Sequence, residues 1–507
     1  MPSIKGKPDN STAGRRALLA GAGSLLFLPW IARAATASAT PATPAVSEQA
    51  WRALAAKVKG GVVRPNDHDF IALSRPQNLR YATEVPLGVA RPRDAAETNA
   101  AIAWCREQGI PMVLRSGGHS YAGCSATTGL IIHTGLMRRV RRINDDTFEL
   151  EAGALFSDVY RALEAANSTN AGGMALPHGR CFGVGASAFL LGGGMGFAMR
   201  EYGLGCDRVL EAEMALADGR VVRASAAENA DLFWALRGGG GGNLGVALRF
   251  KVRAEPAKPI TTYRIVWHRD VPAVFASLVH ALEGAPDRMG SRIGIHATRT
   301  HESKPNTLTL FGQLRGPKDE ARAILAPALA AAPADTDTMQ TTQYWQGQQF
   351  LGVASPPNIY QATSRYSVKL SDGAIEDVVR RCRTWPGTKA SASFFMFHVG
   401  GRIRDIASAD TAYVHREAEW LTGTDVGWTE HDMPAVVATN LAWQREFHDA
   451  SAALMPDGGS FQNFPDPGLA NPAAAYYGAN LERLVAIKRR IDPDGVFTPP
   501  RRQGIVA

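Results

Sequence analysis

Cysteine, charge of one sign and long apolar runs are all scarce in this sequence. The five cysteines among 507 residues are odd in number and widely spaced, so they predict neither a disulfide framework nor a C-x-x-C metal pair. No H-E-x-x-H occurs and His431-Asp432 is an isolated pair, so no metal site is predicted. The chain also lacks a G-x-G-x-x-G turn after a first strand, which argues against a nicotinamide site.

The net charge is only mildly basic. The formal charge is +8, but residues 1–34 carry five basic residues and one acidic residue, so half of the excess lies there. The remaining excess does not predict nucleic-acid binding. The densest basic run, Arg138-Arg139-Val140-Arg141-Arg142, is interpreted as a solvated strand edge or loop and not as a phosphate track.

The N-terminal segment predicts export. Arg15-Arg16 precedes a moderately apolar stretch that ends at Ile31, and Ala32-Arg33-Ala34 offers small residues at the spacing of a cleavage site. The glycines of the stretch and the charge of Arg33 resemble a bacterial twin-arginine signal. We predict a signal peptide over residues 1–34, a periplasmic or secreted protein, and no membrane attachment after removal. The alternative is a retained signal anchor, although about 15 apolar residues are fewer than the roughly 20 of a spanning helix.

Glycine, in contrast, is abundant and gathers in three turns. These are Arg115-Ser116-Gly117-Gly118-His119-Ser120-Tyr121, residues 177–196, and residues 238–245. Glycine costs backbone entropy in helices and strands, so such turns mark places where the backbone closely approaches something. The first turn follows the apolar strand-like run 111–114, and its successive N–H groups could hold an anion such as a pyrophosphate.

The pattern of elements predicts two domains, as the length of the chain also does. A strand at 88–90, a helix from a capping box at Asp94 to a stop at Gly109, and a strand at 111–114 form a β-α-β unit. From Pro256 onward the pattern changes to a second α+β domain with a largely antiparallel sheet. The expected elements are strands at 130–133, 148–151, 214–222, 262–267, 292–296, 307–311 and 393–398, and helices near 157–166, 318–331, 433–453 and 476–492.

Several motifs in the same order resemble the berberine-bridge-enzyme-like family of FAD-linked oxidoreductases, within the wider vanillyl-alcohol-oxidase fold. They cover residues 75–255, Gly400-Gly401 with 411–416, and 477–493. The resemblance implies FAD and an α+β fold, in which a two-lobed PCMH-type FAD-binding domain carries an inserted substrate domain built on an antiparallel sheet flanked by helices. The expected division is a signal at 1–34, a flexible leader at 35–50, the FAD domain at 51–255, the substrate domain at 256–455, and a C-terminal segment at 456–507 that returns to the FAD domain.

The resemblance also implies a flavin bound covalently at two points. The histidine after the double glycine attaches to the 8α-methyl group in such enzymes, and His119 occupies that position. A cysteine in a Gly-x-Cys-x-x-Val-Gly pattern attaches to C6, and Cys181 occupies it. The alternatives are a turn histidine that caps backbone groups and a buried, inert cysteine. Further FAD contacts implied by the resemblance are Arg115, Ser116, Gly117, Gly118, Ser120, Tyr121, Gly185, Gly192, Gly193, Gly194, Gly196, Val246, Tyr477 and Asn480.

One motif departs from the family. Members that oxidise alcohols usually carry Tyr-x-Asn-Tyr-x-Asp, with the first tyrosine as base, and this chain has Phe461-Gln462-Asn463-Phe464-Pro465-Asp466. Phenylalanine cannot accept a proton, so the usual base is missing. Phe461 could instead form an apolar wall for a substrate that needs no base. The replacement candidates are Tyr121, Tyr360, His398 and Tyr413, none of which stands out.

The leading interpretation is an exported flavin oxidoreductase that removes hydride from a small hydroxyl-bearing substrate, such as a sugar, an alcohol or a secondary metabolite. Electrons would pass to dioxygen, with release of hydrogen peroxide. Val184, three residues after Cys181, resembles the residue type of members that react with dioxygen. The alternatives are a dehydrogenase with another acceptor and, from a different class, a flavin-loaded binding protein without turnover. The sequence makes no prediction of oligomeric state.

Overall fold

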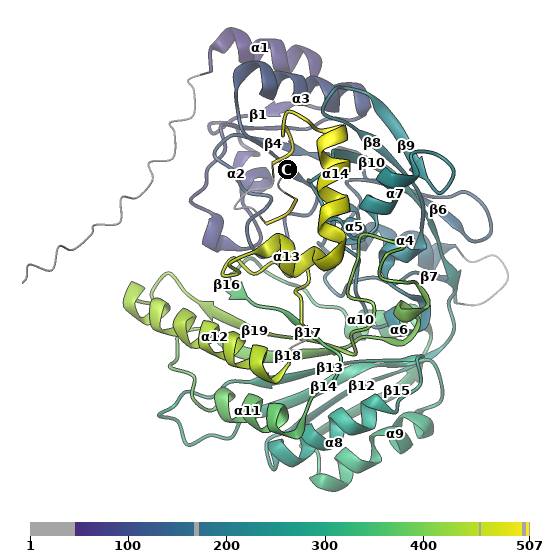
Figure 1. Cartoon of the computed structure of the whole chain (residues 1–507), viewed down its shortest axis with the longest axis vertical. Helices are drawn as coiled ribbons and strands as arrows, with labels where there is room; N and C mark the ends of the chain where they lie inside the picture. Colours follow the sequence, from purple (N-terminus) through teal and green to yellow (C-terminus); the bar gives the residue numbers. More distant parts are fainter. Residues whose placement is uncertain (1–45, 167–171, 456–457, 499–502, 506–507) are drawn as a thin grey trace, which may run out of the picture. The chain divides into compact units, whose positions relative to one another are not determined.

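A small parallel sheet forms where the β-α-β unit is predicted (Figure 1). Strands β2 (Gly88–Ala90) and β3 (Met112–Arg115) both pair in parallel with β4 (Leu130–His133), and β1 (Val62–Val63) pairs antiparallel with β2. Helix α3 (Ala95–Gln108) connects β2 to β3 and ends at Gly109, whose φ is 62°. Only half of the capping box forms, because Asp94 accepts from the Glu97 N–H whereas the Glu97 carboxylate accepts from Gly60 and Arg93. Around this sheet lie α1 (Glu48–Lys57) and α2 (Phe70–Ser74).

The second sheet of this part has five antiparallel strands in the order β5-β6-β10-β8-β9. The basic run ends in the edge strand β5, where Arg138 pairs with Asp158 and Arg141 pairs with Glu149, as expected for a solvated edge. The strands are β5 (Val140–Arg142), β6 (Thr147–Glu151), β8 (Val209–Ala215), β9 (Val221–Ser225) and β10 (Val246–Arg253). The helices of this part are α4 (Phe156–Ala165), α5 (Ala186–Leu191), α6 (Met199–Tyr202) and α7 (Ala230–Leu236). A separate short antiparallel pair is formed by β7 (Met174–Ala175) and β11 (Glu255–Pro256).

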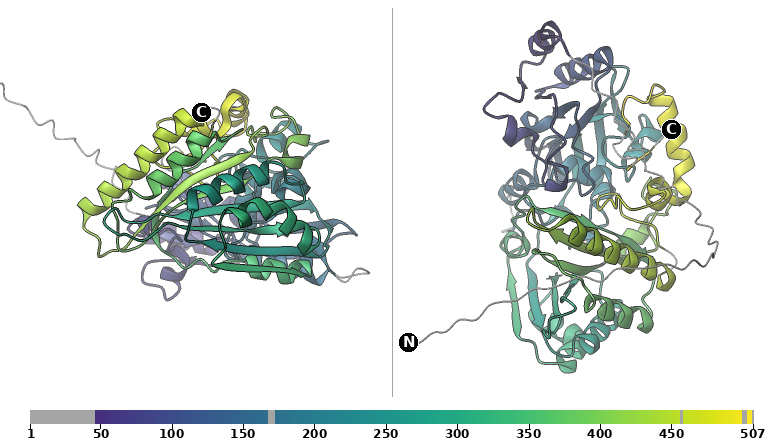
Figure 2. Two further views of the ribbon diagram at one scale, coloured as in Figure 1. Left: turned by 90° about the horizontal axis from the view of Figure 1, so that it is seen from below. Right: turned by 90° about the vertical axis from the view of Figure 1, so that its left-hand side faces the viewer.

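The predicted antiparallel sheet of the second half has eight strands, ordered β15-β12-β14-β13-β18-β19-β16 with β17 also paired to β19. Four of its helices gather on one face (Figures 1 and 2). The fifth, α10 (Tyr344–Leu351), packs on the opposite face, where Tyr344 and Trp345 join the core of the first part of the chain. The strands are β12 (Ile260–Trp267), β13 (Met289–His296), β14 (Thr307–Leu314), β15 (Thr336–Thr342), β16 (Ile359–Ala362), β17 (Arg365–Ser367), β18 (Ala392–His398) and β19 (Trp420–Trp428). The helices are α8 (Val271–Glu283), α9 (Lys318–Ala331), α10 (Tyr344–Leu351), α11 (Asp372–Cys382) and α12 (Pro434–Leu454).

The two faces of the eight-stranded sheet differ because side chains alternate along each strand. Ile293, Phe394 and Val426 point into the core shared with the helices. Their neighbours Arg292, Phe395 and Asp425 therefore point to the opposite face, where they line a cavity. One face stabilises the fold, and the other is available for function.

The C-terminal segment packs against the FAD-domain part of the chain, as the yellow helix α14 (Leu481–Ile491) shows in Figures 1 and 2. The buried Lys488 ammonium donates to the Asn243 carbonyl at 2.7 Å and to the Asp492 carboxylate at 2.5 Å. The continuous helix expected from Tyr476 is wrong, because Gly478 has a φ of 46° and separates α13 (Pro472–Tyr477) from α14.

The structure, a computed structural model, describes residues 46–166, 172–455, 458–498 and 503–505. The predicted signal and residues 35–45 of the predicted leader lie outside these residues. The flexible leader expected up to residue 50 is wrong at its end, because α1 begins at Glu48. Within the described ranges, no helix combines the length and apolar character needed to cross a membrane. Likewise, no group of three or more His, Cys, Asp or Glu side chains is placed to hold a metal in this part of the chain.

Candidate active site

A cavity of about 630 Å³ lies between the glycine-rich loops and the face of the eight-stranded sheet that is opposite to the core shared with α8, α9, α11 and α12. This volume is within the roughly 300–1,000 Å³ typical of ligand and cofactor sites. The loops contribute residues 115–121, 179–185 and 240–247. The sheet contributes Arg292 and Asp425 together with the aromatic rings of Phe395 and Phe397. The cavity thus has one wall of backbone-rich loops and one wall of strand side chains.

The first two glycine loops pack directly on one another. A methyl group built on Gly117 would lie 2.3 Å from the Gly183 carbonyl oxygen and 2.6 Å from the Gly185 nitrogen. One built on Gly185 would lie 2.1 Å from the Ser116 Oγ, and one on Gly183 would lie 2.9 Å from the His119 Nε2. No side chain fits at these distances, so the glycines bring the His119 loop and the Cys181 loop together.

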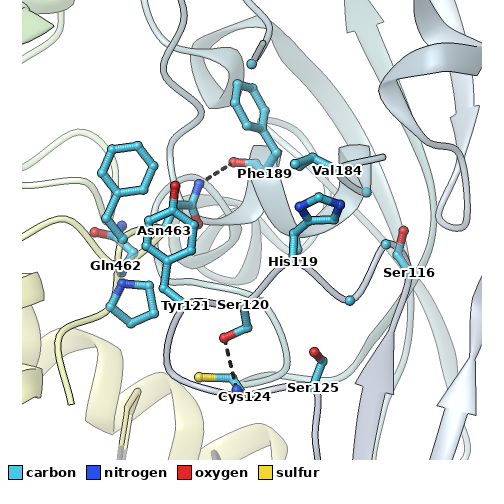
Figure 3. Close-up of a pocket in the computed structure, with 18 of the residues that line it drawn as sticks. Ser116, His119, Ser120, Tyr121, Cys124, Ser125, Val184, Phe189, Gln462 and Asn463 are labelled. Carbon is cyan, nitrogen blue, oxygen red and sulfur yellow. Dashed lines mark hydrogen bonds between the residues drawn. The ribbon is translucent and has the colours of Figure 1, made fainter. Parts of the chain in front are cut away.

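The loop wall offers hydrogen-bond donors that the protein itself does not use. Among the described residues, none of the backbone N–H groups from Gly117 to Tyr121 donates a hydrogen bond. The buried hydroxyl groups of Ser116 and Ser125 also have no partner there. Figure 3 shows both serines at the cavity beside His119. Unpaired buried donors are rare in native proteins, and a row of them is suited to the pyrophosphate of FAD.

Arg115, the first residue of this loop, holds it in place through hydrogen bonds. Its guanidinium group donates to the carbonyl oxygens of Ser125 and Leu73, the latter at 2.8 Å. Burial lowers its pKa to about 10, so it remains a cation at neutral pH. Its hydrogen bonds therefore fix the ends of the loop, and its charge lies beneath the expected pyrophosphate position.

His119 and Cys181 both line the cavity, one from each loop. Burial lowers the pKa of His119, which keeps its imidazole neutral and nucleophilic at neutral pH. Burial raises the pKa of the Cys181 thiol, while the positive charge of Arg180 acts in the opposite direction. The two side chains proposed to carry the flavin thus lie in one cavity, and Val184 lies beside His119 in Figure 3.

The remaining residues implied as FAD contacts divide into two groups. Ser120, Tyr121, Gly185, Gly196, Val246 and Tyr477 also line the cavity. Gly192, Gly193, Gly194 and Asn480 lie outside its wall. Asn480 donates to the Ser408 and Thr411 carbonyls, and the three glycines pack against protein, since a methyl group on Gly192 would lie 1.8 Å from Asn463 Oδ1. These four residues therefore support the site through packing and hydrogen bonds without lining the cavity.

The four candidate bases also fall into two groups, of which only one lines the cavity. Tyr121 and Tyr360 line the cavity with their rings 5.2 Å apart, but burial raises the pKa of each phenol far above neutrality. His398 and Tyr413 lie outside the cavity wall. His398 pairs with Glu419 at 2.6 Å, and the Tyr413 hydroxyl bonds that of Tyr366 at 2.6 Å. Neither of these two side chains is therefore placed to accept a proton from a substrate in this cavity.

The two phenylalanines of the altered motif have different positions. Phe461 is 1% exposed and packs in an apolar cluster with Met195, Tyr413 and Leu421, outside the cavity wall. Phe464 lines the cavity and stacks on Tyr121 at 5.1 Å with the rings nearly parallel. The apolar wall considered for Phe461 is therefore made by Phe464.

Asp425 is a candidate functional residue that the sequence analysis missed. Of the described residues, it provides the only carboxylate that lines the cavity. Burial raises its pKa to about 6, against the opposing effects of the Arg292 charge and of a hydrogen bond from Ser393. The signal was present in the alternation of β19, where residues 421, 423, 425 and 427 share the face opposite to the core.

Comparisons with known proteins agree with this site. Residues 86–225 match a family model described as an FAD binding domain, and residues 460–505 match one described as berberine and berberine like. The FAD-linked oxidoreductase YgaK of Bacillus subtilis is 29% identical over 472 residues, which cover 89% of this chain and 99% of that relative. The glucooligosaccharide oxidase of Sarocladium strictum is 29% identical over 450 residues, which cover 83% and 87%.

A solved structure shows the same fold. It is that of a glucooligosaccharide oxidase from Acremonium strictum with a 6-S-cysteinyl, 8α-N1-histidyl FAD, and it matches with a TM-score of 0.77 and 25% identity over 90% of this chain and 98% of that one. The predicted fold class and the FAD cofactor are confirmed. The chain is thus an FAD-linked oxidoreductase. Its two matched domains and its relatives support a place among the berberine-bridge-enzyme-like enzymes.

Proposed function

We propose that the chain is an exported oxidase that removes hydride from a carbon bearing a hydroxyl group in a small molecule, with its FAD attached through His119 and Cys181. One observation supports this above all: a single cavity joins both attachment residues on its loop wall to the carboxylate of Asp425 on its sheet wall. The names of the oligosaccharide oxidases among the relatives agree with a hydroxyl-bearing substrate such as a sugar.

The residues of the loop wall would hold the cofactor. The N–H groups of residues 117–121 and the hydroxyls of Ser116 and Ser125 would bind its pyrophosphate. The His119 imidazole and the Cys181 sulfur would anchor the ring system at the 8α-methyl group and at C6. When bound, FAD supplies the hydride acceptor of the reaction.

Asp425 would accept the proton of the substrate hydroxyl. Because its pKa is raised to about 6, the carboxylate is ionised at neutral pH and still basic enough for proton transfer. Tyr121 and Tyr360 are much poorer acceptors, since burial holds both phenols protonated. Ser393, which lies opposite Asp425 in the β18–β19 pair, would orient the carboxylate, and the ring of Phe464 would exclude water.

Dioxygen is the proposed electron acceptor. The small side chain of Val184 at the cavity supports this choice, and a dehydrogenase with another acceptor is the alternative. Reduced protein mixed with oxygen in a stopped-flow instrument separates the two: rapid reoxidation with peroxide release is expected, and slow reoxidation would favour the dehydrogenase. Export through the twin-arginine segment is part of the proposal, and a fusion of residues 1–34 to a folded reporter tests it.

The attachment is tested by acid precipitation of purified protein, followed by mass mapping of tryptic peptides. Flavin is expected on the peptides of both His119 and Cys181, whereas free flavin in the supernatant would contradict attachment. A screen of sugars, alcohols and hydroxy acids for peroxide tests turnover in the same preparation. A fully flavinylated protein that oxidises none of them, with any acceptor dye, would instead support the flavin-loaded binding protein.

A further inference from the structure

Two arginines face the cavity from different elements. Arg180 precedes the attachment cysteine, and Arg292 lies on β13. Both guanidinium groups lie over the ring of Phe311, with their central carbons 4.3 Å and 5.3 Å from its centroid. Arg292 is also 5.4 Å from the ring of Phe395 and 5.5 Å from that of Phe397. Aromatic contacts of this kind fix the position of a guanidinium plane while leaving its N–H edges free.

These N–H edges have almost no partners within the described residues. Arg292 makes no hydrogen bond or ion pair there, and Arg180 donates only its Nε, to the Leu351 carbonyl. Elsewhere the chain pairs its buried arginines closely. Arg416, for example, holds both oxygens of Asp207 at 2.8 Å. Arg180 and Arg292 are half-buried at the cavity wall, so their unpaired N–H edges are available to an anionic ligand there.

The carboxylate of Asp425 does not neutralise the positive charges of Arg180 and Arg292. It lies on the same sheet face as Arg292 and feels the arginine's charge, but no ion pair joins the two among the described residues. Its raised pKa, about 6, also shows that Arg292 offsets only part of the effect of burial. Arg180 and Arg292 repel one another enough to lower the pKa of Arg180, after the larger effect of burial. The substrate half of the cavity therefore keeps an excess of positive charge.

We propose that the substrate is a hydroxy acid, whose carboxylate is bound by the N–H edges of Arg180 and Arg292 while its hydroxyl group faces Asp425. This inference rests on the proposed function. Guanidinium groups bind carboxylates in a planar, two-pronged geometry, which suits an anion lying between two of them. Sugar acids and aromatic hydroxy acids share this chemistry, and the aromatic rings of the wall could accept either.

The test compares matched acids and neutral compounds on the flavinylated protein. One arm uses a hexuronate against the corresponding hexose, and the other uses hydroxymethylbenzoate against benzyl alcohol. We expect kcat/KM for the better acid to exceed that of its neutral partner by about 10- to 100-fold, as hydrogen bonds to charged groups typically allow. The arm with the larger preference for the acid shows whether the substrate is a sugar acid or an aromatic hydroxy acid. An equal or greater kcat/KM for both neutral compounds would overturn the proposal.

The variant Arg292→Met tests the residue itself. It should remove most of the preference for the acid, mainly through a higher KM. The two compounds are compared well above pH 6, because loss of the Arg292 charge raises the pKa of Asp425 and lowers turnover of both compounds equally nearer to that pH. Arg264→Met is the matched control, because Arg264 lies on β12 of the same sheet but outside the cavity wall. An equal loss for acid and neutral compounds, together with a lower flavin reduction potential, would assign the charge to the cofactor and overturn the proposal.

Two readouts do not depend on turnover. Calorimetric titration with benzoate should give binding that weakens about tenfold or more in Arg292→Met and is unchanged in Arg264→Met. The Tm of Arg292→Met should equal or exceed that of the parent protein, because no hydrogen bond or ion pair is lost and methionine can keep the packing against the aromatic rings. Benzoate binding that depends on Arg292 without any oxidation would retain the anion site and reject the proposed function. Oxidation without selectivity for acids would retain the proposed function and reject the anion site.

Discussion

The two walls of the cavity recognise different things by different means. The loop wall presents backbone N–H groups and two hydroxyls, and its glycines exist because no side chain fits between the loops. The sheet wall presents charged and aromatic side chains, spaced by the alternation of the strands. A cofactor that never changes can be held by the backbone, whereas a substrate that differs between relatives is matched by side chains. On the proposed function, the loop wall would determine the chemistry by holding the cofactor, and the sheet wall would select the substrate.

The largest effect is expected from Asp425→Asn, which removes the proposed proton acceptor from the sheet wall. General bases typically contribute about 10²- to 10⁴-fold, so kcat/KM should fall by that factor with flavin content unchanged. Asp405→Asn is the matched control, because Asp405 is 58% exposed and pairs only with Arg402. Steady-state kinetics with any turned-over substrate measures both. If Tyr360→Phe caused this loss while Asp425→Asn did not, the tyrosine would be the acceptor.

The loop wall should be broken by Gly117→Ala. The added methyl would lie 2.3 Å from the Gly183 carbonyl oxygen, so the two loops must separate. Overpacking of this kind typically costs about 1–3 kcal/mol of unfolding free energy, and the flavin-to-protein ratio should fall with it. Gly373→Ala is the control, since a methyl there meets nothing within 4 Å. Full flavin loading in Gly117→Ala would show that the loops need not touch.

The pH dependence of kcat/KM tests the role of Asp425. Its pKa is raised to about 6 by burial, and the ionised form is the one that accepts a proton. Activity should therefore rise with pH and level off above about 6, and kcat/KM should fall about tenfold per pH unit below that value. This acid limb should be absent from the residual activity of Asp425→Asn. A limb that persists in the variant would belong to another group.

The smallest effect is expected from Ser125→Ala. Its buried hydroxyl has no described partner, and an unsatisfied group of this kind costs about 1–3 kcal/mol, so the flavin-free protein should keep or slightly raise its stability. The flavin-loaded protein should lose stability instead. Thermal unfolding of both forms measures the difference. A loss in the flavin-free form alone would mean that the hydroxyl serves the fold and not the cofactor.

The sequence predicted the loop wall well and the sheet wall poorly. Glycine at positions 117 and 118 can be read locally, because a turn and its function lie in the same few residues. Asp425 and Arg292 are 133 positions apart in the numbering, and only the order β13-β18-β19 places them on one face. The same limit applies to His398, which was one of the four candidate bases. Its partner Glu419 and its place behind the sheet depend on strand pairing, which no local motif encodes.

The attachment of the C-terminal segment has a consequence for how the protein is made. The third glycine loop is held by Lys488 through Asn243, by Tyr477 through Gly239, and by the backbone of Ile505. A ribosome-bound chain lacking these residues cannot complete the wall against which Tyr477 lies. On the proposed function, FAD would then be loaded only after these residues have been synthesised and packed, and export would carry a folded protein with its flavin in place.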